Sequence, residues 1–141
     1  MIDIDGLTAK SVDQLKDDEG FRARPYFCSR GKLTIGYGWN LESDPMRVVE
    51  AEYRLKNDVL EAIADIARSF PWFKDLDIVR QSAMVNLRFN LGLSGLYEFR
   101  RFLDAMKRGD YAQAEAELID SEWHNQVGAR AARIEAMIRE G

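Results

Sequence analysis

The sequence predicts an α+β fold in which a small hairpin lobe accompanies a larger helical lobe. In residues 24–41, apolar side chains occupy every second position, the period of a half-buried strand. From Asp44 onward, they recur every three, four or seven residues, the period of helices. The first helical run continues without a breaker to Pro71, a length of about 39 Å at 1.5 Å per residue, and can bridge two lobes.

A short helix is predicted before the hairpin, over residues 8–19. Thr8 can cap its start, and Gly20 stands where helices commonly end in a left-handed residue. The hairpin itself is predicted from the alternation of Leu33, Ile35 and Tyr37 with polar or small residues, after a turn at 29–31.

The remaining chain is predicted to be helical. Asp44-Pro45 should begin the long helix as a cap followed by proline at the first helical position. Further helices are predicted at 76–91, 97–108, 110–120 and 128–140. Gly92 should end the first and Gly109 the second, and Asp110 should cap the third. We expect one domain over 1–141, with a hairpin lobe at about 20–43 and a helical lobe at about 44–141 plus the N-terminal helix.

Composition excludes several classes of protein. Apolar residues at 46% and charged residues at 31% are typical of a globular chain. One cysteine and one histidine exclude an intrachain disulfide and a Cys-His zinc site. A net charge of −4 argues against binding nucleic acid through bulk charge. The acidic start predicts no signal peptide and no stable membrane association, so we expect synthesis in the cytoplasm.

The densest cluster of reactive groups lies between Glu19 and Gly38. Glu19 ends a helix, where the negative dipole should raise the pKa of its carboxyl group and suit it to general acid catalysis. The alternative is that Glu19 is one of several solvated acids at a frayed helix end. Thr34 should lie on the face opposite Leu33 and Ile35, where a hydroxyl can position a water molecule. Its alternative is an ordinary strand threonine.

These residues resemble a known family. Glu19, Cys28 and Thr34, with Ile-Gly-x-Gly following Thr34, have the order and spacing of the catalytic signature of phage-type lysozymes, the muramidases similar to the T-even phage enzyme. Two later blocks, at 86–92 and 123–133, are similar to the family's cleft-lining helix end and its C-terminal tryptophan segment.

The resemblance implies a lysozyme-like fold and a role for each matching residue. Glu19 would be the general acid, Cys28 the second catalytic group and Thr34 the water-orienting hydroxyl. Arg130 would support the glutamate. The positions implied to bind substrate are Gly38, Asn40, Phe89, Asn90, Phe102 and Glu117.

The resemblance also implies an endolysin that hydrolyses the β-1,4 bond between N-acetylmuramic acid and N-acetylglucosamine in peptidoglycan glycan strands. No metal or organic cofactor is implied, because acid-assisted hydrolysis needs two polar groups and water. We expect a monomer that stays in the host cytoplasm until a holin permeabilises the membrane, and that then acts at the periplasmic cell wall. The alternatives are a lytic transglycosylase, or a catalytically inactive wall-binding module on the same fold.

The role of Cys28 stays open between nucleophile, water activator and spectator. A free thiol has a pKa near 8.5 and is mostly uncharged at neutral pH. The side chains of Arg22, Arg24, Arg30 or Lys32, if they reach the sulfur, would favour the thiolate. The single histidine, His124, follows Trp123 in what we interpret as a packing segment.

Overall fold

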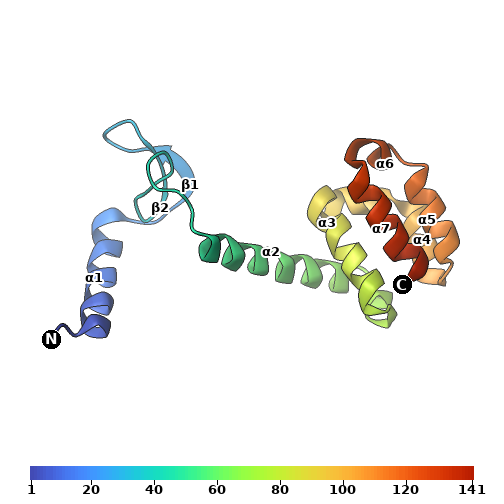
Figure 1. Ribbon diagram of the computed structural model, residues 1–141, viewed down its shortest axis with the longest axis horizontal. Helices are drawn as coiled ribbons and strands as arrows, with labels where there is room; N and C mark the ends of the chain where they lie inside the picture. Colours follow the sequence, from blue (N-terminus) through green and yellow to red (C-terminus); the bar gives the residue numbers. More distant parts are fainter. The chain divides into compact units, whose positions relative to one another are not determined.

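The computed structural model describes residues 1–141 and divides into two compact units, Met1–Glu52 and Tyr53–Gly141 (Figure 1). The first unit contains a helix and all the β-strands, and the second is entirely helical apart from turns. This is the predicted α+β class. The expectation that the N-terminal helix joins the larger lobe within one domain stays a prediction. None of the helices combines the length and apolarity that a bilayer crossing requires.

The first unit begins with α1, Ile4–Glu19. The predicted cap at Thr8 is wrong, because the Asp3 carboxylate accepts a hydrogen bond from the Gly6 N–H at 3.1 Å and starts the helix earlier. The predicted end is confirmed. Gly20 follows the helix with φ of 70°, and its N–H donates to the Lys16 carbonyl at 3.0 Å.

A three-stranded antiparallel sheet follows, with strands β1 (Arg22–Phe27), β2 (Leu33–Gly36) and β3 (Trp39–Asn40) in that order. The turn predicted at 29–31 is present, and the Gly31 N–H donates to the Cys28 carbonyl at 2.8 Å. The sequence missed β3, because two residues are too short to display a strand period.

Thr34 is the one buried residue of this unit, 3% exposed. Within β2 it lies on the face opposite Leu33 and Ile35, as predicted, but its side chain is covered rather than open to solvent. It pairs with Tyr26 of β1 on one side and Asn40 of β3 on the other, so its strand is covered along both edges.

The long helix α2 spans Val48–Ser69, so the predicted start at Asp44-Pro45 is also wrong. The Trp39 indole N–H donates to the Asp44 carbonyl at 2.9 Å and keeps that residue in the loop. The helix is started instead by Glu50, whose carboxylate accepts from the Arg47 N–H at 3.1 Å.

The second unit contains most of α2, a 3₁₀ helix at Pro71–Asp75, and α3 (Ile78–Glu98), α4 (Arg100–Arg108), α5 (Tyr111–Ile119), α6 (Glu122–Val127) and α7 (Ala129–Glu140). Gly109 ends α4 and Asp110 caps α5, as predicted. Gly92 interrupts α3 with φ of 74° and ψ of 166°, but the chain resumes a helical path beyond it. The short α6 was not predicted, and it begins where the Ser121 hydroxyl accepts from the His124 N–H.

The hydrophobic core lies entirely in this second unit. Five helices contribute its largest fully buried side chains, namely Ile66, Met84, Leu87, Leu96, Phe102, Met106, Leu118, Ile134 and Ile138. Helices α4, α5 and α7 lie side by side around it (Figure 1).

Arg80 fixes the end of α7 to this core. Its guanidinium donates to the carbonyls of Ile138 at 2.7 Å and Arg139 at 2.9 Å, and lies 3.5 Å from the centre of the Tyr111 ring. Carbonyls in the last turn of a helix lack intrahelical partners, so Arg80 satisfies groups that α7 cannot.

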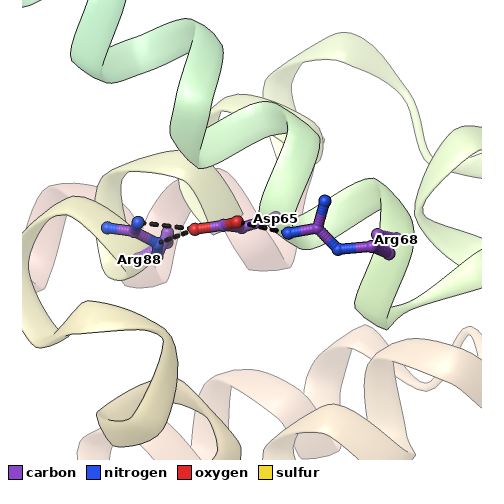
Figure 2. A network of polar contacts seen from close by, with 3 residues as sticks. All are labelled: Asp65, Arg68 and Arg88. Carbon is purple, nitrogen blue, oxygen red and sulfur yellow. Dashed lines mark hydrogen bonds and ion pairs between the residues drawn. The ribbon is translucent and has the colours of Figure 1, made fainter.

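An ion-pair network joins α2 to α3 (Figure 2). The Asp65 carboxylate accepts from Arg88 at 2.6 and 3.2 Å on one oxygen and from Arg68 at 2.7 Å on the other. The hydrogen bonds from Arg88 hold the pKa of the Asp65 carboxyl group below its ordinary range, although partial burial opposes them.

Candidate active site

Glu19 stands at the C-terminal end of α1 and lies against the turn between β2 and β3. A Cβ atom built on Gly38 would lie 2.6 Å from Glu19 Oε2 and 2.9 Å from its carboxyl carbon. The carboxylate therefore occupies the space that a side chain at position 38 would need. Gly38 also has φ of 74°, which only glycine adopts without strain.

Cys28 follows β1 at the opposite end of the hairpin, facing Lys32 across the turn. Its N–H donates to the Lys32 carbonyl at 2.9 Å, and its thiol is half-buried. The backbone N–H groups of Lys32 and then Arg30 lower the pKa of the thiol, and burial opposes them. The pKa is lowered, as it would be by basic side chains that reached the sulfur, but backbone amides rather than arginine or lysine side chains are the main cause.

The strand register explains why Thr34 lies beside Cys28. Phe27 pairs with Leu33 and Tyr26 with Thr34, so Thr34 is the diagonal neighbour of Cys28 two residues beyond Lys32. Its hydroxyl donates to the Lys32 carbonyl at 2.9 Å. A hydroxyl has one proton to donate and two lone pairs, so this oxygen can still accept a hydrogen bond from water.

Asn40 pairs with Thr34 from the third strand, and its side chain shapes the following loop. Its Oδ1 accepts from the N–H groups of Glu42 at 3.0 Å and Ser43 at 3.2 Å. Glu42, which the sequence analysis did not select, accepts from the Leu33 N–H at 2.9 Å. Cys28, Thr34, Gly38 and Asn40 thus lie on one small sheet and its turns, and Glu19 of α1 lies against Gly38.

In the second unit, Arg130 and Phe89 line one pocket of about 380 Å³. The Arg130 guanidinium donates through Nε and Nη2 to Asn86 Oδ1 at 3.0 and 2.7 Å. This bond fixes the orientation of the arginine. The sequence placed Asn86 in the block at 86–92 but did not indicate its bond to Arg130, because the two residues lie 44 positions apart.

The other residues of the predicted substrate site lie elsewhere in this unit. Asn90 accepts a hydrogen bond from the indole N–H of the buried Trp123 at 3.0 Å. Phe102 is 1% exposed and packs in the core, and it lines a pocket of about 340 Å³ together with Glu117.

His124 has a structural partner, as the packing interpretation anticipates. Its Nδ1 is paired with the carboxylate of Glu135, a buried residue of α7. The pair satisfies an acidic group inside the helical core and joins α6 to α7.

Comparison with known proteins assigns the family. A family model described as phage lysozyme matches residues 16–139. The pre-baseplate central spike protein Gp5 of Enterobacteria phage T4 is 26% identical over 97% of this chain, which spans 29% of that protein's length. Probable T4-type lysozyme 1 of Dictyostelium discoideum is 25% identical, with 96% of each chain covered. An endolysin of Acyrthosiphon pisum secondary endosymbiont phage 1 is 28% identical over 80% of this chain and 77% of its own. The chain therefore belongs to the phage lysozyme family.

Proposed function

We propose that this protein is a muramidase that hydrolyses the β-1,4 bond between N-acetylmuramic acid and N-acetylglucosamine in peptidoglycan. Membership of a family of glycoside hydrolases supports the reaction class. The observation that carries the proposal is the small sheet, where the Glu19 carboxyl group of α1 lies against Gly38 and a thiol with a lowered pKa lies beside the Thr34 hydroxyl.

In the proposed mechanism, Glu19 donates its proton to the glycosidic oxygen as the bond between that oxygen and the anomeric carbon breaks. Positive charge develops on the sugar ring. A water molecule held by Thr34 then attacks the anomeric carbon, and the Cys28 thiolate accepts its proton. The cycle ends with Cys28 protonated and Glu19 ionised, and exchange with solvent restores both groups. Attack by water gives inversion at the anomeric carbon, whereas attack by the thiolate itself would give retention.

Glycan-binding residues are proposed in each unit, taken by itself. Gly38 and Asn40 lie on the sheet, and Phe89, Asn90, Phe102 and Glu117 lie in the helical unit. Arg130 is proposed to support Glu19. The 45% exposed ring of Phe89, beside Arg130 in its pocket, supports contact with a sugar face.

A digest of purified peptidoglycan tests the proposal. Mass spectrometry should find fragments with intact reducing ends, and proton NMR should identify the anomer that forms first. Fragments lighter by one water would identify a lytic transglycosylase instead. No fragments at all would leave a wall-binding module as the better description.

Substitution of Glu19 provides the sharper test. Glu19→Gln preserves shape but removes the proton, and it should lower the rate by about 10²–10⁴-fold or more, the range for loss of general acid catalysis. Asp18→Asn is the matched control, because it removes a neighbouring exposed acid from the same helix end. Wild-type activity in Glu19→Gln would contradict the mechanism.

We further propose that the enzyme acts as an endolysin, as a monomer, after a holin opens the membrane. The similarity to a phage endolysin supports this setting. Expression in Gram-negative cells should leave cultures intact until chloroform permeabilises the inner membrane. Spontaneous lysis at low expression, with the membrane potential intact, would contradict dependence on a separate protein.

A further inference from the structure

The two chain segments that flank the candidate acid are joined by an aromatic pair. Arg22 pairs with Gly36 in antiparallel register, so the preceding residue Phe21 faces Tyr37. The centres of their rings lie 5.4 Å apart at an interplanar angle of 50°, a favourable tilted geometry. Both side chains are largely exposed, Phe21 at 64% and Tyr37 at 49%, so the pair fills no core.

Tyr37 also contacts the helix that ends in Glu19. The Lys16 ammonium group lies 5.9 Å from the centre of the Tyr37 ring, within the range of a cation–π contact. The Lys16 carbonyl accepts the Gly20 N–H that closes the helix. The Tyr37 ring thus contacts the last turn of α1 on one side and the start of β1 on the other.

Gly20 lies between the end of α1 and this aromatic pair, and Gly38 follows Tyr37 in the turn from β2 to β3. Both glycines have positive φ, 70° and 74°, and both chain reversals depend on it. Glycine has the most backbone freedom of any residue, so neither reversal by itself fixes where Glu19 points. The carboxylate nevertheless lies within 2.6 Å of the position of a Gly38 Cβ.

We propose that Phe21 and Tyr37 form an aromatic clip that positions the Glu19 carboxyl group over Gly38. The clip, defined as these two side chains, consists of positioning residues that act through Glu19 and do not touch the reacting atoms. The inference rests on the proposed function and extends it by naming what holds the acid in place. Because two flexible glycine reversals flank Glu19, loss of either ring would release the carboxyl group without removing it.

Kinetics of clip variants test this inference. A misplacement of about 1 Å can cost about 10²-fold in rate, so Tyr37→Ala and Phe21→Ala should each lower kcat by up to that factor. KM should change by no more than about twofold, because the acid is not needed for ground-state binding. Tyr37→Phe keeps the ring and should retain nearly full activity. The double variant should be no slower than either single variant, since either loss opens the clip.

Phe27→Ala is the matched control, because Phe27 is a 72% exposed aromatic residue at the other end of β1. It should leave kcat unchanged. A rise in KM at constant kcat in Tyr37→Ala would overturn the inference, because the rings would then be a stacking surface for sugar.

NMR spectroscopy separates failure of the clip from failure of the proposed function. Nuclear Overhauser contacts between the Glu19 Hγ and Gly38 Hα protons should appear in the wild-type protein and in Tyr37→Phe, and should vanish in Tyr37→Ala and Phe21→Ala. This readout needs no enzymatic activity. Contacts between Thr34 and Asn40 report the intact sheet and should persist in all variants. Persistence of the Glu19–Gly38 contact in Tyr37→Ala would overturn the inference. Loss of the Thr34–Asn40 contacts in the same variant would also overturn it, because the two rings would then stabilise the whole sheet rather than position Glu19.

Discussion

The two units of the chain differ in how their side chains are used. Tyr53–Gly141 holds every buried apolar residue of the core, drawn from six helices and the 3₁₀ segment with its flanking residues. Met1–Glu52 buries a single side chain, the hydroxyl-bearing Thr34, and is organised by hydrogen bonds and glycine turns. The unit with the least apolar burial carries Glu19 and Cys28.

This difference has a physical basis. A packed apolar core stabilises a unit but offers no polar atoms for proton transfer. Backbone amides and hydroxyl groups in a thinly packed sheet can be directed at a reactive group, at some cost in stability. Substitutions in the first unit should therefore alter activity most, and substitutions in the second should alter stability most.

After Glu19, the largest expected effect is at Cys28. If its thiolate activates water, Cys28→Ala should lower the rate by about 10²–10⁴-fold, the range for a lost general base. Cys28→Asp supplies a carboxylate and should keep much of the activity, whereas Cys28→Ser should fall near Ala because a hydroxyl does not ionise at neutral pH. Rates and product anomers from a peptidoglycan digest check this, and equal activity in all three variants would show that the thiol is a spectator.

A core substitution should give the opposite pattern. Leu87 is fully buried in α3, so Leu87→Ala should lower the free energy of unfolding by about 2–5 kcal/mol. Activity per folded molecule should stay unchanged at low temperature. Ile119→Ala, at a 47% exposed position in α5, should cost no more than about 0.5 kcal/mol. Denaturant unfolding measures both free energies. A large fall in kcat for folded Leu87→Ala would contradict the view that substitutions in the second unit alter stability rather than activity.

Asn90 accepts a hydrogen bond from Trp123 and is also a proposed substrate-binding residue. Asn90→Ala leaves the buried indole N–H of Trp123 without its acceptor and should cost about 1–3 kcal/mol of stability. Asn125→Ala, at an exposed position in α6, is the control and should cost little. Denaturant unfolding followed by tryptophan fluorescence gives the stability. A rise in KM larger than that of the control would support a substrate contact at Asn90. An unchanged KM would indicate that Asn90 serves only to bind the Trp123 indole.

The smallest expected effect depends on pH and concerns Asp65. Its folded-state pKa is lowered by Arg88, so its ionised form stabilises the fold fully above the unfolded pKa of about 3.9, and this contribution is lost as the pH falls through the folded value. Asp65→Asn should lower the melting temperature by several degrees at neutral pH, and the gap to wild type should narrow below about pH 4. Asp104→Asn removes an exposed partner of Arg108 and should change little at any pH. A gap that stays constant down to acid pH would contradict the charge-based account of Asp65.

Local chemistry in the sequence was enough to predict several boundaries. Gly20 ends α1, Gly109 ends α4 and Asp110 caps α5, because a positive φ or a side-chain cap acts within a few residues. The failures at Thr8 and Asp44 have a related cause. Each can cap a helix, but Asp3 caps the same helix earlier in the chain, and the Trp39 indole of β3 donates to the Asp44 carbonyl and holds Asp44 in the loop.

The sequence by itself determined the α+β class, the order of the elements other than β3 and α6, and the spacing of Glu19, Cys28 and Thr34. Tertiary structure alone decided that Thr34 is buried and that Gly38 leaves space for the Glu19 carboxylate. It also decided that the backbone amides of Lys32 and Arg30 lower the pKa of the Cys28 thiol. The reason is that periodicity and capping are properties of neighbouring residues. Strand register, burial and the direction of a backbone N–H arise only when segments distant in sequence pair with one another.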